Sequence, residues 1–478
     1  MKKNQLSESA KSAVVYTFAT LFSRGLAIIT VPIFTRMMTT TQIGTVNLYN
    51  SWYSLISAFA TLSLTSGGFA VAMKEYAGDR DKYQSAVLSL TSIIAMIIAS
   101  VFLLAPSFWS KILGLPRVLV ILMLVGFLFA PARDFWLARQ RYEYKYKLAG
   151  TVTIGSALIA SILSVGAVLY SNEYGTIDAA DARLIANYAV VYGVAAIIWI
   201  STFVKGKTFF NIEYWKMSLA LSIPLVGYSI AAQILSVSDR MMISQMVGNS
   251  AVGVYGTLYT VSSLSLMIWQ AIHSSFVPFL FQNIEKKEQN IKNVSFVLML
   301  LYALVAVVLT YMAPEIVRVL ATEEYMEAIY IMPPIAAGVF FTAYANIYSD
   351  IAVYFKKTKY VMYPAIVAAA ANLVLNYIFI KMFGYMAAAY TTLIAYILLA
   401  YLQAVWANKV CKENGIGKEK IFSDQKMLVM AIVTVVLCLL GLALYHFTVL
   451  RYIVVLGVIV FSIFLAKKYN VKQMMMMK

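Results

Sequence analysis

The sequence predicts an all-α polytopic membrane protein with about fourteen transmembrane helices. Hydrophobic residues make up 62% of the 478 residues, charged residues only 12%, and the mean hydropathy is +0.78. A soluble domain carries about 25% charged residues. Apolar stretches of roughly 20 residues, each long enough to cross a bilayer as a helix, recur along the whole chain. No segment has the composition of a soluble domain.

The N-terminal MKKNQLSESAK leads into an apolar segment with no small-residue cleavage site. We therefore expect it to be retained as a helix rather than removed as a signal peptide. An even number of crossings would place both termini on one side of the membrane. Helices are expected near residues 13–36, 45–70, 85–105, 118–137, 148–170, 184–204, 217–243, 252–275, 294–313, 328–353, 360–380, 386–407, 427–446 and 451–467.

The distribution of basic residues predicts the orientation. Of the 38 Lys and Arg residues, 28 lie in the polar segments on the side of the N-terminus, and 8 lie in the opposite connections. Because positive charge accumulates in cytoplasmic loops, we expect both termini in the cytoplasm. The net charge of +17 is then explained by topology, and no nucleic-acid partner is expected.

An internal repeat divides the chain. TQIGTVNLYNSWYSL (residues 41–55) aligns with SAVGVYGTLYTVSSL (residues 250–264) at a shift of 209 residues, which pairs Gly44 with Gly253. The repeat predicts two six-helix bundles, residues 1–204 and 205–407, followed by a cytoplasmic linker and two extra helices in residues 408–478. Because six is even, the two halves would insert in the same direction, an arrangement that usually encloses a central cavity. Chance similarity between apolar segments is the alternative.

Arg24 is a charge in the middle of the first expected helix. It lies about 16 Å along the helix axis from Ala13, close to the middle of the bilayer. A central arginine costs about 2.5–3.5 kcal/mol on insertion scales. We therefore expect Arg24 to face a hydrated cavity or an acidic partner, and a buried structural ion pair is the alternative.

Asp239 and Arg240 close the expected helix 217–243. Asp239 lies about 33 Å from Met217 along the axis, which places the two residues at the outer rim. Adjacent helical residues point about 100° apart and do not face each other. We expect each side chain to contact its own partner or water. A role in transport is one interpretation, and simple solvation at the rim is the alternative.

Further polar residues mark the inner side of the membrane. Arg133 and Asp134 close the helix expected at 118–137, and Asp350 closes the one at 328–353. These helices are equivalent under the repeat, so each half would have an acidic residue near the inner mouth of the cavity. The alternative is that these residues only anchor the helix ends at the membrane surface. Asn372 and Asn376 lie one turn apart on one helix face; interhelical hydrogen bonding is expected first, and cavity lining second.

The sequence contains none of the common enzymatic signatures. It has no Gly-x-x-x-x-Gly-Lys-Ser/Thr loop for ATP, no His-Glu-x-x-His and no nucleophile elbow. Its two cysteines suggest neither a disulfide framework nor a metal site. We therefore expect neither an enzyme nor a bound cofactor.

Three segments resemble the bacterial polysaccharide transporters of the O-antigen flippase (Wzx) type. They are SRGLAIITVPIFTRMMTTTQIGTVNLY (residues 23–49), DRMMISQMVGNSAVGVYGTLYTVSSL (239–264) and AANLVLNYIFIKMFGYMAAAYTTLIAY (370–396). That family belongs to the multidrug/oligosaccharidyl-lipid/polysaccharide exporters, together with MATE drug antiporters and the lipid II flippase, so a MATE-like fold is implied. After Gly384 the family favours a second glycine, and here Met386 precedes the alanines.

The resemblance implies a transport function. Such a flippase moves an undecaprenyl-diphosphate-linked oligosaccharide, an O-antigen or capsule repeat unit, from the inner to the outer leaflet of the bacterial plasma membrane. Arg24 would contact the diphosphate, Arg240 and Arg133 would stand at the outer and inner mouths, and Asp239 and Asp350 would exchange partners with them. Membrane lipids, a glycan polymerase and a chain-length regulator are implied as partners, and coupling to Na⁺ or H⁺ stays open.

Three rival functions remain at this point. A MATE-type drug antiporter would share the fold but would favour acidic cavity residues for cationic drugs. A lipid II flippase would share the fourteen-helix count. A membrane polymerase or ligase would need a sizeable outer loop with catalytic residues, and the longest outer connection, SNEYGTIDAADAR (residues 171–183), is too short for one.

Overall fold

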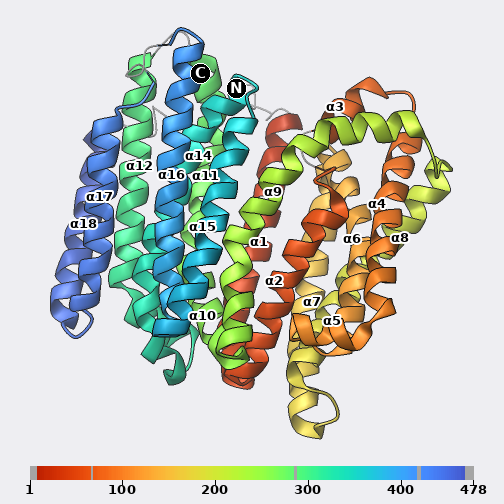
Figure 1. Ribbon diagram of the computed structural model, residues 1–478, viewed down its shortest axis with the longest axis horizontal. Helices are drawn as coiled ribbons and strands as arrows, with labels where there is room; N and C mark the ends of the chain where they lie inside the picture. Colours follow the sequence, from red (N-terminus) through yellow and green to blue (C-terminus); the bar gives the residue numbers. More distant parts are fainter. Residues whose placement is uncertain (1–7, 66–67, 285–287, 417–420, 469–478) are drawn as a thin grey trace, which may run out of the picture. The chain divides into compact units, whose positions relative to one another are not determined.

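The computed structural model describes residues 8–65, 68–284, 288–416 and 421–468. These residues form eighteen α-helices and one 3₁₀ helix, and they contain no strand (Figure 1). The all-helical class predicted from the sequence is confirmed.

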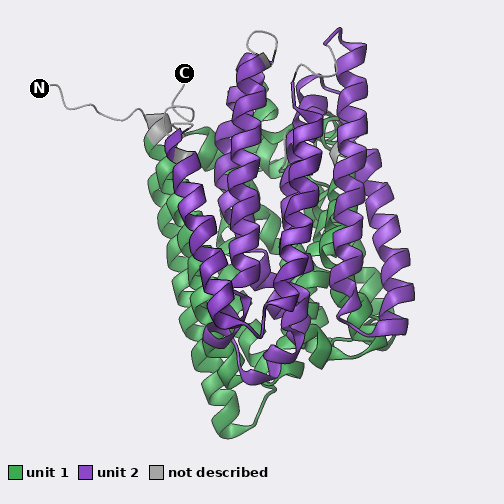
Figure 2. Ribbon diagram, turned by 90° about the vertical axis from the view of Figure 1, so that its left-hand side faces the viewer, with its two compact units in different colours: residues 1–253 green, residues 254–478 purple. Residues whose placement is uncertain are grey.

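Two compact units divide the chain, residues 1–253 and residues 254–478 (Figure 2). The first unit contains α1 (Glu8–Met37), α2 (Thr40–Thr61), α3 (Gly68–Glu75), α4 (Arg80–Leu104), α5 (Pro106–Leu113), α6 (Arg117–Tyr142), α7 (Tyr146–Tyr174), α8 (Ala179–Gly206) and α9 (Ile212–Met246). Helix α10 (Asn249–Ser262) begins in this unit. The second unit contains α11 (Ser265–Asn283), α12 (Glu288–Tyr311), α13 (Ala313–Leu320), η1 (Glu323–Ile331), α14 (Met332–Tyr354), α15 (Lys359–Phe383), α16 (Ala387–Glu413), α17 (Asp424–Ala443) and α18 (Thr448–Lys468).

All fourteen expected segments coincide with long helices. The segment expected at 252–275 corresponds to α10 and α11, which are separated by a break at residues 263–264. Within the described residues, twelve helices are long and apolar enough to cross a membrane, and α9 makes a thirteenth despite a bend of 51° between Ile223 and Val226. Helix α2 is not among them because polar side chains such as Asn47 and Asn50 interrupt its apolar sequence. The chain is a multi-pass membrane protein.

Several helix boundaries differ from the expected ones. The helix expected at 45–70 ends at Thr61, because Leu62 and Ser63 adopt left-handed backbone angles, with φ of 46° and 53°. A right-handed helix cannot continue through such residues. The short helix α5 lies in a connection for which no helix was expected, and α3, α13 and η1 lie mainly in such connections, overlapping the ends of expected helices by a few residues.

Polar side chains define where three helices begin. The hydroxyl of Thr39 accepts a hydrogen bond from the Gln42 backbone N–H, and the Gln42 side chain accepts one from the Thr39 backbone, which forms a capping box at α2. Asp178 and Asn211 cap α8 and α9 through their side-chain oxygens. Each cap satisfies backbone N–H groups that the first helical turn leaves without partners.

The boundary of the first unit differs from the division that the repeat predicts, which falls at residues 204/205. Helix α9 packs along α2 and also contacts α3 and α4, so it belongs to the first unit in three dimensions. The repeat-based division into 1–204, 205–407 and 408–478 stays a prediction about sequence equivalence.

Helix α2 and the start of α10 cross at the two glycines that the repeat pairs. A Cβ on Gly44 would lie 1.7 Å from the Asn249 carbonyl oxygen, and a Cβ on Gly253 would lie 1.9 Å from the Thr40 carbonyl oxygen. Thr40 and Asn249 are themselves 209 residues apart, so the two clashes are equivalent under the repeat. The crossing is therefore symmetric about the two glycines and supports the alignment.

Candidate functional site

A polar pocket of about 370 Å³ lies inside the first unit, among α1, α2, α6, α7 and α8. Helices α1 and α7 contribute mainly hydroxyl groups, among them Ser23 and Ser156. Asn50 and Asn187 contribute amides, and Arg133 and Arg183 contribute guanidinium groups. Because these helices are otherwise apolar, so many polar groups in one place mark the pocket as the strongest candidate site in this unit.

Arg133 is the predicted site residue that lines this pocket. It lies on α6 more than two turns before the helix ends at Tyr142, and therefore deeper than the helix end where the sequence analysis placed it. Its Nη2 donates to the Ser156 hydroxyl over 3.3 Å. Its Nε is buried and has no hydrogen-bond partner among the described residues. An unpaired N–H in a polar pocket is available to an acceptor on a ligand.

Arg183 also lines the pocket, and the sequence analysis did not single it out. The helix was expected to begin at residue 184, with Arg183 in the outer connection, whereas α8 begins at Ala179. The guanidinium stacks over the Phe34 ring, 3.6 Å from its centroid. An earlier helix start, signalled by the Asp178 N-cap, could have placed this residue correctly.

The charge of the pocket has one sign. No aspartate or glutamate is among its described lining residues, whereas two arginines are. A cavity of this kind favours an anionic ligand, because the guanidinium group offers several donors in a planar fork that matches phosphate and carboxylate oxygens.

Arg24 lies beside this pocket rather than in its lining. Ser23, Ala27 and Thr30 of α1 face the pocket, and Arg24 points roughly 90° away from them around the helix. Its side chain is exposed. The contact between Arg24 and a ligand stays a prediction.

The structure corrects the expectation for Asp239 and Arg240. The two side chains do approach each other: Arg240 Nη1 lies 3.8 Å from Asp239 Oδ1, and Asp239 is only 1% exposed. The contact arises because Asp239 Oδ1 accepts a hydrogen bond from the Arg240 backbone N–H, while the guanidinium curls back to donate to the Ser236 carbonyl. Since α9 continues to Met246, the pair lies about two turns before the helix end, not at it.

The remaining acidic residues have different surroundings. Asp350 is buried near the end of α14 and pairs with His273 of α11, with 2.8 Å between Oδ2 and Nε2. No pattern in the sequence predicted this pair. Asp134 is exposed on α6.

Asn372 and Asn376 are fully buried between α15 and α16. Asn372 donates to the Thr392 hydroxyl over 3.2 Å, Asn376 donates to the Asn372 side chain over 3.2 Å, and Thr391 donates to Asn376. The structure thus contains the interhelical hydrogen bonds that were expected first. A role in lining a cavity stays a prediction.

The second unit contains an apolar groove of about 770 Å³ among α12, α17 and α18. Leucine, valine and phenylalanine side chains such as Leu300, Val433 and Phe461 form its walls. Gln425 and Lys426, in the first turn of α17, provide polar groups at one end. A groove of this composition suits a hydrocarbon chain.

A family model described as polysaccharide biosynthesis protein matches residues 9–284, and a MatE family model matches residues 224–378. No curated protein matches the chain.

Among solved structures, the chain is similar to the lipid II flippase MurJ in an inward closed conformation, with 17% identity and a TM-score of 0.66 over 96% of this chain and 100% of that one. It is also similar to an inward-facing multidrug resistance MATE family transporter of the MOP superfamily, with 16% identity and a TM-score of 0.58 over 82% of this chain and 95% of that one. A MOP superfamily transporter from Pyrococcus furiosus matches with 13% identity and a TM-score of 0.51 over 83% of this chain and 95% of that one. These likenesses confirm the MATE-like fold.

Proposed function

Because the chain belongs to the polysaccharide biosynthesis protein family, whose model matches more than half of it, we propose that it is a flippase for a lipid-linked oligosaccharide. The proposed substrate is an undecaprenyl-diphosphate-linked repeat unit of O-antigen or capsule, moved from the inner to the outer leaflet of the bacterial plasma membrane by alternating access. The process is transport rather than catalysis.

The observation that carries this proposal is the acid-free pocket with Arg133 and Arg183 among otherwise apolar helices. A diphosphate cannot cross hydrocarbon without compensating charge. Charge-assisted hydrogen bonds from guanidinium groups in a polar pocket supply that compensation. The exposed Arg24 on α1 would extend the same cationic surface.

The lipid tail needs a different environment. The apolar groove among α12, α17 and α18 would hold part of a polyprenyl chain. In the predicted orientation, the inside-negative potential favours export of each negative charge by about 2.3 kcal/mol per 100 mV. Coupling to Na⁺ or H⁺ entry would add to this driving force.

Two alternatives share the fold. The likeness to the lipid II flippase MurJ covers 96% of this chain, so lipid II is the second candidate substrate, and rescue of cells depleted of their lipid II flippase would identify it. A MATE-type drug or cation antiporter fits less well, because a pocket for cationic drugs would be expected to contain acidic residues. A drug-resistance assay separates that function from the other two.

The test is glycan export in cells that lack their own flippase for the repeat unit. Arg133→Gln and Arg24→Ala should each lower surface glycan at least tenfold, because each removes a charge-assisted contact worth about 1.5–3 kcal/mol, while membrane abundance stays unchanged. Arg36→Gln is the matched control, since Arg36 is exposed on α1 and donates to the Pro32 carbonyl. Normal export by both variants would rule out a cationic path through these residues.

A further inference from the structure

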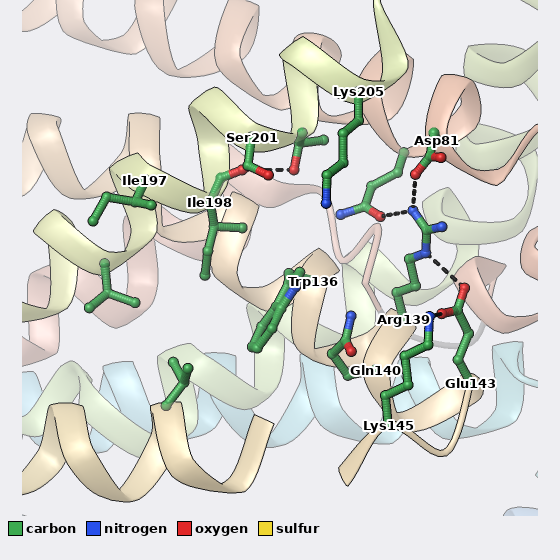
Figure 3. Close-up of a pocket in the computed structure, with 14 residues that line it drawn as sticks. Asp81, Trp136, Arg139, Gln140, Glu143, Lys145, Ile197, Ile198, Ser201 and Lys205 are labelled. Carbon is green, nitrogen blue, oxygen red and sulfur yellow. Dashed lines mark hydrogen bonds and ion pairs between the residues drawn. The ribbon is translucent and has the colours of Figure 1, made fainter. Parts of the chain in front are cut away.

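A second pocket, of about 530 Å³, lies where α6 and α8 end and where α4 and α7 begin (Figure 3). We call it the α6/α8 pocket. One part of its lining is charged and another part is apolar, with Trp136 between them in Figure 3. The charged residues are Asp81, Arg139, Glu143, Lys145 and Lys205, and the apolar ones include Val194, Ile197 and Ile198.

Ion pairs organise the charged part. Arg139 Nη1 lies 2.5 Å from Asp81 Oδ1, and Arg139 Nε lies 2.9 Å from Glu143 Oε1. Lys145 Nζ contacts the other oxygen of Glu143 at 2.6 Å. These contacts join α4, the end of α6 and the start of α7. Ion pairs between different helices therefore hold the charged part of the pocket together.

Lys205 stands apart from this network. Among the described residues, no hydrogen bond or ion pair engages its ammonium group, and Figure 3 shows the side chain directed into the pocket. Three basic side chains and two carboxylates line the pocket, so one positive charge is left uncompensated. The charged part therefore fits a ligand with a single negative charge.

The apolar part opens toward the surrounding lipid. On α8, Ile197 is 69% exposed, and Ile200 and Val204 follow at helical spacing with exposures of 55% and 64%. These residues share one face of the helix, and an exposed aliphatic face of a membrane-spanning helix contacts acyl chains. A free anion would leave this part of the pocket uncovered.

We propose that the α6/α8 pocket binds an anionic phospholipid of the leaflet around it. Its phosphodiester contacts Lys205, and one acyl chain lies along Val194 and Ile197. A zwitterionic lipid would bring its own ammonium group next to Lys205 and bind less well. This site is separate from the transport pocket around Arg133 and does not depend on the proposed substrate.

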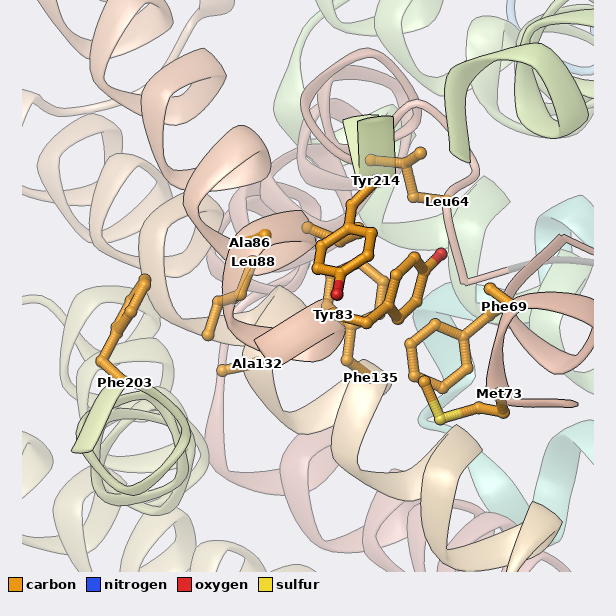
Figure 4. Packing of buried hydrophobic residues seen from close by; sticks show 12 residues of the cluster. Leu64, Phe69, Met73, Tyr83, Ala86, Leu88, Ala132, Phe135, Phe203 and Tyr214 are labelled. Atoms are coloured by element: carbon orange, nitrogen blue, oxygen red, sulfur yellow. The ribbon is translucent and has the colours of Figure 1, made fainter. Parts of the chain in front are cut away.

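Three of the helices around the pocket are packed together by a buried hydrophobic cluster. It includes Tyr83 and Leu88 of α4, Phe135 of α6 and Phe203 of α8 (Figure 4). The bound lipid would add contacts at the helix ends, beyond the reach of this cluster. We therefore expect it to stabilise this end of the first unit.

Trp136 provides a direct probe of occupancy. The full chain is reconstituted into phosphatidylcholine vesicles that contain, at the same mole fraction, either acyl-brominated phosphatidylglycerol or acyl-brominated phosphatidylcholine. The part of the tryptophan quenching that is lost in Trp136→Phe reports bromine near the pocket. Brominated phosphatidylglycerol should quench this part more strongly.

Variants at Lys205 test the charge. Lys205→Gln should lower the preference for phosphatidylglycerol about fivefold, because one basic residue near the membrane surface contributes about 1 kcal/mol to the binding of anionic lipid. Lys205→Arg should keep the preference. Lys216→Gln is the matched control, since Lys216 is exposed and does not line the pocket.

Three outcomes would overturn the proposal. They are equal quenching of the Trp136 component by both brominated lipids, an unchanged preference in Lys205→Gln, and loss of the preference in excess glycerol 3-phosphate, which would indicate a site for free phosphate esters. None of these measurements involves glycan export, so a failed transport assay leaves the lipid site unaffected, and the reverse also holds.

Discussion

Glu143 connects three basic side chains at one end of the first unit. It lies 2.9 Å from Arg139, 2.6 Å from Lys145 and 3.7 Å from Arg80. Burial raises the pKa of its carboxyl, but the hydrogen bonds from Lys145 and Arg139 outweigh burial and hold the pKa below its usual value of about 4.5. A carboxyl with a depressed folded-state pKa stabilises the fold above its unfolded-state pKa, and this contribution is lost as the pH falls through the folded-state pKa.

Glu143→Gln should therefore lower the thermal unfolding temperature at pH 7, where the carboxylate is ionised. At a pH below the folded-state pKa, wild type and variant should unfold at nearly the same temperature. The measurement is thermal unfolding in detergent at both pH values. Glu75 is exposed at the end of α3, so the control Glu75→Gln should not show an unfolding-temperature difference from wild type that disappears at low pH. If Glu143→Gln lowered the unfolding temperature equally at both pH values, the ionic explanation would be contradicted.

Some of the polar residues in this protein could be identified from the sequence, but their contacts could not. Arg24 and Arg133 could be singled out because charge within an apolar segment is conspicuous. The contact between Asp239 and Arg240 could not, because ideal helix geometry separates adjacent Cβ directions, whereas the long guanidinium side chain bends back along its own helix. The pair of His273 and Asp350 joins residues 77 positions apart, and no local pattern signals it.

At the scale of helices, the crossing of α2 with the start of α10 imposes a strict steric limit. Gly44 and Gly253 bring the two backbones together, with the nitrogen of each glycine 3.0 Å from the Cβ position of the other. The nearest atoms to both positions are backbone carbonyl oxygens, which cannot rotate away as a side chain does. The Thr40 and Ser250 hydroxyls, 2.8 Å apart, add a hydrogen bond at the same crossing.

Gly44→Ala should therefore separate the two helices and destabilise the protein by about 1–3 kcal/mol or more, as overpacking does. Gly155→Ala is the control, because Gly155 lies within α7 and a Cβ there meets nothing within 4 Å. Thermal unfolding of the purified variants, together with their abundance in the membrane, measures the effect. Equal stability of Gly44→Ala and Gly155→Ala would mean that the crossing is looser than the structure describes.

The hydropathy pattern was sufficient to locate the thirteen described segments that are long and apolar enough to cross a membrane, because a stretch of about twenty mainly apolar residues is typical of a transmembrane helix. It could not locate the ends of helices that depend on caps or on left-handed residues such as Leu62 and Ser63. It also missed the break between α10 and α11 at residues 263–264, because the apolar sequence continues through it.

At the scale of the whole molecule, the sequence predicted a division by repeat, whereas packing divides the chain after Gly253. The repeat shows which segments are equivalent in sequence, whereas the compact units are defined by which helices contact one another. These two criteria separate at α9, which follows the first six predicted helices in sequence but packs along α2. Only the three-dimensional contacts could reveal this.

The orientation of the molecule is predicted by charge alone, and it decides on which side each pocket opens. Tyr144 lies two residues before α7 begins and is 52% exposed, and Tyr174 is the last residue of α7 and is 59% exposed. With Cys411 and Cys438 replaced by serine and alanine, we expect Tyr174→Cys to react with a membrane-impermeant maleimide in intact cells. Tyr144→Cys should react only after the cells are permeabilised.

The physical reason is that the predicted topology places 28 of the 38 basic residues on the side of Tyr144. Moving them across the membrane during insertion would oppose the positive-inside bias. This orientation would place the α6/α8 pocket, with Lys205, in the cytoplasmic leaflet. The anionic phospholipid that we propose as its ligand would then come from that leaflet. If Tyr144→Cys were labelled in intact cells instead, the pocket would face the outer leaflet. That result would contradict the orientation predicted from the basic residues.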